Sequence, residues 1–341
     1  MVTFMVVSLL FLLASLIMAL PWWLLVRVGE YQRRQASPAE QAAFYLSSLV
    51  VPVLLLALLL FLTMGPWDAD FCEKLHQTCI NHLRALHLPL PLDLVLVGLP
   101  LLVLIRLGLM LRPNRRPTAG ETIPAELAAK WDRVAACLAD LTGRAVPRLT
   151  LIDHPDAVCF VQGSYSPRLV ISRQLLAILD EDELSGAIAH ELAHLRRYDL
   201  LSGYLAAACH HLLFFLPVSR YCYRRWREER EKACDDLAVH WTGHRLALAS
   251  ALVKVAQMAQ RQPQAALACH LLTPGGSFTL RVERLLDPAA FALAPSAARY
   301  PWGLIVIGAF LSSQLSLNYS AWHHHLELAS VWLLSCIGAV S

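Results

Sequence analysis

Two histidines and a glutamate stand close together at His190, Glu191 and His194. On a helix, residues four apart lie on one face, about 6 Å apart along the axis, so both imidazoles can reach one metal ion. Glu191 is rotated by about 100° from His190 and would lie beside the metal. A carboxylate there can take a proton from an attacking water and return it to a leaving amine. The pattern predicts half of a zinc-dependent hydrolytic site.

The flanking residues favour a helix for this segment. Asp180 is suited to the N-cap, and three acids, Glu181, Asp182 and Glu183, follow in the first turn. Apolar side chains recur at spacings of three and four, at Leu184, Ile188, Leu192 and Leu195. A pair of solvated or core histidines is the alternative, so the motif needs a further ligand.

A charged stretch from Arg227 to Val239 offers that ligand. Glu231 and Asp235 share one helix face, which suits one acid for the metal and another for the free ring N–H of a ligating histidine. Glu228 competes as the ligand because it also shares a face with Asp235. Cys234 lies on a different face from Glu231 and is expected to pack rather than to bind. An ordinary solvated helix is the alternative.

Three motifs together resemble a known family. They are His190–Asp199 (HELAHLRRYD), Glu231–Val239 (EKACDDLAV) and Gly275-Gly276-Ser277 followed by Arg281–Leu286. They are similar to the membrane-embedded zinc metallopeptidases of the BlaR/MecR type, which are gluzincins, over roughly residues 120–290. The resemblance implies Zn²⁺ bound by His190, His194 and Glu231, with Glu191 as catalytic base and Asp235 supporting a ligand. The chain resembles the CAAX-type and HtpX-like membrane proteases more loosely.

The composition indicates a membrane protein. Of 341 residues, 57% are hydrophobic and 16% charged, and the mean hydropathy is +0.48. Apolar runs at about 1–26, 44–64, 94–111 and 301–318 predict four transmembrane helices. We therefore expect an α+β membrane protein: three spans in 1–112, a mostly helical zincin-like domain with a small sheet in 113–299, and a fourth span in 300–341. Whether the apolar segment 326–341 spans the membrane stays open.

Arginines indicate the orientation. Arg27, Arg33 and Arg34 follow the first span, and a second arginine group follows the third at Arg112, Arg115 and Arg116. Both loops should be cytoplasmic, which puts the N-terminus outside a bacterial-type inner membrane and the protease domain inside. A disulfide between Cys72 and Cys79 in the exterior loop is open. The net charge of +3 gives no argument for direct nucleic-acid binding.

The cytoplasmic domain should contain a helix at 124–141 and strands at 147–153, 157–162 and 168–171. The 158–162 strand is the candidate edge for pairing with an extended substrate. Leu200–Pro217 is apolar, but a crossing there would put Glu231 on the opposite side of the membrane from His190. We expect a buried or membrane-lying helix instead. Arg196 or Asp199 is expected to fix the end of the zinc helix.

The function expected is endopeptidase cleavage of a protein or peptide, in regulated proteolysis of a transcriptional repressor or of the protein itself. The oxyanion stabiliser is expected among Arg281, Tyr198 and His244; for Arg281, a surface or headgroup role is the alternative. About two dozen residues follow Asn318, too few for the exterior penicillin-binding domain of the resembled proteins, so a sensor partner is considered. A signal transducer, a non-catalytic zinc scaffold and a quality-control protease are the alternative functions.

Overall fold

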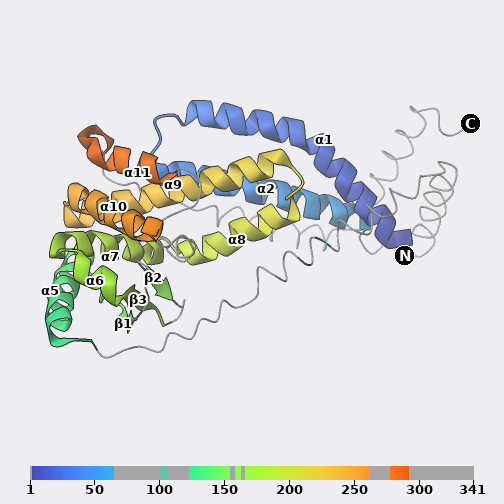
Figure 1. The fold of residues 1–341 in the computed structure, drawn as a ribbon. Helices are drawn as coiled ribbons and strands as arrows, with labels where there is room; N and C mark the ends of the chain where they lie inside the picture. The colour runs from blue at the N-terminus through green and yellow to red at the C-terminus, as the bar shows by residue number, and fades with distance from the viewer. Residues whose placement is uncertain are drawn as a thin grey trace, which may run out of the picture.

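The computed structural model describes residues 2–64, 102, 105, 123–153, 158–162, 166–261 and 277–291. Figure 1 shows long helices running side by side and, at one end of them, a smaller part that carries a three-stranded sheet. The described part is therefore mostly helical with a small sheet, as the sequence predicts.

The sheet is mixed and short. Strands β1 (Arg148–Ile152), β2 (Cys159–Gln162) and β3 (Arg168–Ser172) lie in the order β1-β3-β2. β1 is parallel to β3 and β2 is antiparallel to it, with Phe160 opposite Val170. β2, which contains most of the predicted edge strand, therefore does lie at an edge of this sheet.

Helices cover the sheet and form the first core. These are α5 (Ala125–Thr142), α6 (Arg173–Ile178), α7 (Glu181–Arg196) and α10 (Arg245–Arg261), with α11 (Ser277–Leu286) and a 3₁₀ turn, Pro288–Phe291, following. Trp131, Val134 and Leu138 of α5 are buried at the predicted helical spacing. They pack with the sheet and with the apolar face of α7, including Leu184 and Ile188.

The long helices form the second core. Helices α1 (Val2–Gln32) and α2 (Pro38–Met64) make one hairpin, and α8 (Asp199–Leu212) and α9 (Pro217–Thr242) make another. Buried side chains of α2 at helical spacing, Ala42, Tyr45, Leu46 and Leu49, pack with residues of α8 and α9 such as Cys209 and Trp226. Leu200–Pro217 is thus mostly helix α8, packed on α2 and α9, and its last residues form the turn from which α9 runs back toward α7.

Membrane-spanning segments are described in part. Among the described helices, Pro38–Leu55 of α2 is long and apolar enough to cross a membrane by length and composition, and 44% of it is buried inside the protein. The predicted runs 1–26 and 44–64 lie in α1 and α2, which extend beyond them to Gln32 and back to Pro38. The spans predicted at 94–111 and 301–318, the segment 326–341 and the Cys72–Cys79 pair lie outside the described residues, apart from 102 and 105. The four-span topology stays an expectation.

Candidate metal centre

Helix α7 carries the two histidines on a well-defined start. Asp180 caps the helix: its Oδ1 accepts the backbone N–H of Glu183 at 2.8 Å, and its own N–H donates to Glu183 Oε2 at 2.8 Å. This reciprocal pair satisfies two backbone donors that a helix end leaves open. His190 and Glu191 are buried, and the side chain of His194 is 16% exposed.

Helix α9 brings Glu231 against both imidazoles. Its Oε2 lies 3.5 Å from His190 Nε2 and 3.8 Å from His194 Nε2. Two ligand atoms on one tetrahedral zinc, each about 2.0–2.1 Å from it, are separated by about 3.4 Å. Among the described residues, the buried His190 Nε2 and Glu231 Oε2 have no hydrogen-bond partner. The three side chains therefore fit a shared metal ion, and the distances match ligands better than hydrogen bonds.

Each histidine is also held from behind by an acid. Asp235 Oδ1 is 2.9 Å from His190 Nδ1, and Asp199 Oδ2 is 2.8 Å from His194 Nδ1. His194 Nδ1 hydrogen-bonds to Asp199, and His190 Nδ1 faces Asp235 at ion-pair distance. A proton on each Nδ1 suits these contacts and leaves both Nε2 atoms for a metal. The sequence predicts that Asp235 supports a histidine, but it predicts only a helix-end role for Asp199. The missing information is the backbone conformation of Tyr198, whose φ of 55° turns the chain so that Asp199 comes back toward His194.

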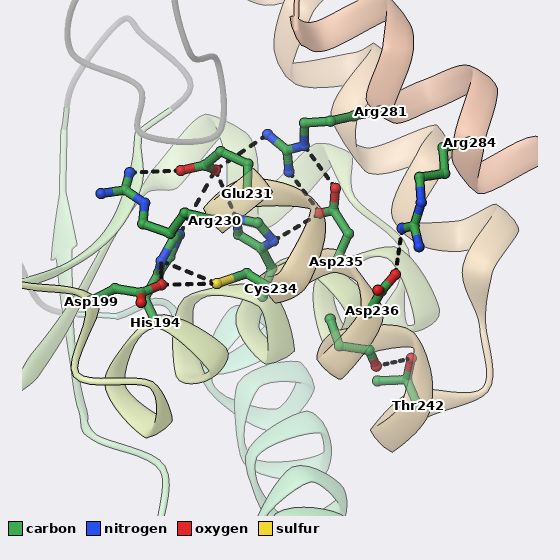
Figure 2. Close-up of polar contacts among 12 residues, drawn as sticks. His194, Asp199, Arg230, Glu231, Cys234, Asp235, Asp236, Thr242, Arg281 and Arg284 are labelled. Atoms are coloured by element: carbon green, nitrogen blue, oxygen red, sulfur yellow. Dashed lines mark hydrogen bonds and ion pairs between the residues drawn. The ribbon is translucent and has the colours of Figure 1, made fainter. Parts of the chain in front are cut away.

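Two arginines hold the acids, the buried Arg281 and the partly exposed Arg230, as Figure 2 shows. Arg281 Nε and Nη2 donate to the two oxygens of Asp235 at 2.8 and 2.7 Å, and Nη1 lies 3.5 Å from Glu231 Oε2. Arg230 Nη2 donates to Glu231 Oε1 at 2.7 Å, which leaves Oε2 toward the histidines. Sequence reasoning gave Arg230 no role. The alternative of a surface or headgroup Arg281 is wrong, since this residue is 1% exposed.

The arginines keep the acids ionised despite burial. Burial raises the pKa of Asp235, but the Arg281 guanidinium outweighs it and lowers the pKa to about 2. Burial likewise raises the pKa of Glu231. The neighbouring charges, of which Arg230 has the largest effect, together lower it by more, so the pKa of Glu231 lies well below the usual range. Both carboxylates are therefore charged at neutral pH, which a metal ligand and its support require.

Cys234 lies behind His194, near Asp199. Its Sγ is 3.2 Å from His194 Nδ1 and 3.2 Å from Asp199 Oδ2 (Figure 2). These three side chains are also close enough to hold a metal ion together. That set would need His194 Nδ1, the atom that already meets Asp199. Burial raises the pKa of Cys234 well above its usual range, which disfavours a thiolate ligand.

The other residues predicted for the site, Glu228, Tyr198 and His244, are not brought to the metal ligands, although Tyr198 lies beside His194. Glu228, the competing ligand, pairs with Arg225 at 2.9 Å. Tyr198 is 64% exposed and lines a hollow of about 520 Å³ beside His194. His244 is exposed and lies 3.8 Å from Asp182, which stands on α7 about 12 Å along the axis from His190. The structure therefore does not bring His244 to the ligands.

Glu191 faces a hollow that reaches the sheet edge. The hollow, of about 350 Å³, is lined by Glu191, His194 and Val161 of β2, and by aromatic side chains of α8 and α9, Tyr204, Tyr223 and Trp226. Glu191 is 3% exposed, and its Oε1 has no hydrogen-bond partner among the described residues. A buried carboxylate beside two histidines and a second acid, open to a cleft next to an edge strand, is the arrangement of a hydrolytic metal site.

Comparison with known proteins agrees with a hydrolytic metal site. Residues 129–285 match the family model described as BlaR1 peptidase M56. The chain is 30% identical over 170 residues to "Protease HtpX homolog" of Acidiphilium cryptum (strain JF-5), covering 40% of this chain and 58% of that protein. It is 32% identical over 96 residues to "Protease HtpX homolog" of Aquifex aeolicus (strain VF5), covering 28% of this chain and 32% of that protein.

The matched region contains α7, α9 and Arg281, which together build the metal centre. The resemblance to membrane zinc peptidases of the BlaR/MecR type is thereby confirmed. The chain spans less than two thirds of the length of these HtpX relatives.

Proposed function

We propose that the protein is a membrane zinc-dependent endopeptidase that hydrolyses peptide bonds of a protein or peptide on the cytoplasmic side of a bacterial-type inner membrane. One observation carries the proposal: His190, His194 and Glu231 bring three ligand atoms close together, two of them buried and that of His194 partly exposed, with Glu191 beside them at a cleft. A zinc ion held there would supply a Lewis acid for the scissile carbonyl and an activated water.

Glu191 is the proton carrier of this proposal. Its buried carboxylate can accept the proton of the attacking water and deliver it to the departing amine. Asp235 and Asp199 fix the imidazole tautomers, and Arg281 and Arg230 fix the carboxylates. These contacts leave little freedom at the ligands, which favours precise positioning.

The sheet edge is the proposed substrate platform. β2 lies at an edge of the described sheet, and its Val161 lines the cleft that contains Glu191. An extended peptide that adds to this edge would run past the metal centre, with main-chain hydrogen bonds fixing its register.

We propose that Arg281 positions the ligands rather than the oxyanion, because its donors face Asp235 and Glu231. Tyr198 is then the better placed oxyanion candidate of the three, since it shares a hollow with His194.

The biological role is proposed in two forms. Regulated proteolysis of a repressor or of the protein itself, with a sensor partner and no direct nucleic-acid contact, follows the BlaR1 match. Membrane quality control is the second candidate, favoured by the relatives named as HtpX homologues. Cleavage of one specific protein under one stimulus would favour regulation, and cleavage of many unfolded membrane proteins would favour quality control.

The test of the chemistry is Glu191→Gln. We expect the variant to keep about one zinc per chain and to lose cleavage, by a factor of at least about 10², because the amide cannot accept a proton. Asp182→Asn, on an exposed side chain of the same helix, is the matched control and should keep both. Parent-like cleavage by Glu191→Gln would refute the proposal, as would the absence of zinc from the parent protein.

A further inference from the structure

A third hollow lies between the α1–α2 turn, α9 and the C-terminal part of the described chain. Its volume is about 800 Å³, within the roughly 300–1,000 Å³ range of small-molecule sites. We call it the cationic pocket, after the six basic side chains that line it: Arg27, Arg33, Arg34, Arg225, Lys232 and Arg284. The lining residues do not include His190, His194 or Glu231, so the pocket is separate from the metal centre.

The acids in the lining are already engaged. Glu30 accepts hydrogen bonds from Arg27 at 2.7 Å and from Tyr45 and Tyr221 at 2.7 and 2.6 Å. The other two, Glu229 and Asp236, pair with Lys232 and Arg284. Six basic and three acidic side chains leave an excess of three positive charges among the lining residues.

Arg33 and Arg34 carry much of that excess. The Arg33 guanidinium lies over the ring of Phe44, 4.8 Å from its centroid, and that of Arg34 lies over Tyr31 at 4.4 Å. Neither makes an ion pair with any residue that the structure describes. Stacking on a ring orients a guanidinium while its N–H groups can still donate to an anion. The pocket thus presents positioned donors without matching acceptors.

We propose that the cationic pocket binds a phosphate-bearing ligand. Guanidinium forks match phosphate oxygens bidentately, and the bond is charge-assisted. The excess of positive charge and the size of the pocket both suit a phosphate group with an attached body. A phospholipid headgroup and a soluble phosphate compound share this chemistry. Lys232 and Asp236 of the pocket lie next in sequence to Glu231 and Asp235 on α9, so the ligand would contact the helix that presents the metal ligand.

The test measures binding to the full chain in a zwitterionic detergent, without any assay of cleavage. Inorganic pyrophosphate is one probe, and micelles that contain phosphatidylglycerol, compared with phosphatidylcholine, are the other. Saturable rises in Tm give the affinities, which should weaken with added salt. Arg33→Gln with Arg34→Gln should weaken binding at least about tenfold, since each charge-assisted bond contributes about a factor of ten.

The matched control is Arg148→Gln with Arg168→Gln, two exposed arginines that lie opposite each other on β1 and β3. It should bind within about twofold of the parent, and the two arginine pairs remove the same charge. The single substitutions Arg33→Gln and Arg34→Gln should each give part of the loss, which keeps the test open if the double variant does not fold. Binding of phosphatidylglycerol alone identifies a headgroup site, and binding of pyrophosphate identifies a site for soluble phosphates. Binding of neither probe, or parent-like binding by the Arg33 and Arg34 variants, would overturn the proposal.

Discussion

At the scale of single residues, the metal centre is a set of paired charges in which each ligand has a support. His190 is backed by Asp235, which Arg281 holds; His194 is backed by Asp199. A buried charge without a partner is costly, so these side chains depend on one another. The supports should therefore affect metal affinity although they do not bind the metal.

Asp199→Asn tests that dependence. The amide is a poorer acceptor for the His194 ring N–H, so the imidazole is less well fixed and less basic. We expect zinc affinity to fall by about 10–100-fold, measured by competition with a chelator of known affinity. Asp182→Asn is the control, and an Asp199→Asn variant with parent-like affinity would show that this acid supports the helix end alone.

At the scale of elements, the packing of α7, which carries both histidines, against α10 depends on a glycine. Gly186 lies against α10: a Cβ there would stand 3.3 Å from Leu248 Cα. Gly203 of α8 has more room, because a Cβ would meet nothing closer than 3.8 Å. Close approach of α10 to α7 therefore depends on the glycine at 186, whereas the packing of α8 against α9 does not require one at 203.

Gly203→Ala and Gly186→Ala compare the two positions. Alanine in a helix gains about 1 kcal/mol over glycine. We expect Gly203→Ala to be stabilising, and Gly186→Ala to fall short of it by about 1 kcal/mol because α10 must shift. The free energies of unfolding in denaturant measure this difference, and equal effects of the two substitutions would contradict it.

The N-terminal turn of α7 should also make the stability of the protein depend on pH, through Glu183. Burial raises the pKa of Glu183, but hydrogen bonds from Lys254 at 2.5 Å and Ser250 at 2.6 Å outweigh it, so the pKa lies below its ordinary value of 4.5. A lowered pKa in the folded state means stability that is present above about pH 4.5 and is lost as the pH falls through the lower folded value. Glu183→Gln should thus be less stable than the parent by about 1–3 kcal/mol at pH 7.

That difference should shrink as the pH falls below 4.5, because protonated glutamate and glutamine then resemble each other. Thermal unfolding of both proteins between pH 7 and pH 3 measures it. A difference in stability between the two proteins that does not change with pH would show that Glu183 stabilises the fold through packing and helix capping, not through its charge.

At the scale of the whole molecule, α9 joins two cores. Trp226 and Cys222 belong to the core of the long helices, whereas Ala238 and Val239 belong to the core under the sheet. Glu231 lies between these two stretches of α9. The candidate metal centre therefore forms where the core of the long helices meets the core that contains the sheet.

The sequence predicts much of this arrangement from local pattern. Spacing along α7 places both histidines and the cap at Asp180, and alternation predicts the three strands. What it misses depends on distant contacts: Arg281 reaches Asp235 from α11, and Asp199 reaches His194 through the left-handed turn at Tyr198. The sequence does not predict that α2 packs against α9. A helix face that packs on protein and one that contacts lipid have the same apolar composition, so the pattern does not tell them apart.

Zinc content after exchange of each of two glutamates on α9 tests the central claim most directly. The account predicts that Glu231→Gln loses most of its zinc, because one of three ligands is gone, whereas Glu228→Gln, three residues away and paired with Arg225, keeps about one zinc per chain. Both are measured by metal analysis on folded, purified protein. Full zinc in Glu231→Gln, or its loss in Glu228→Gln, would contradict the account.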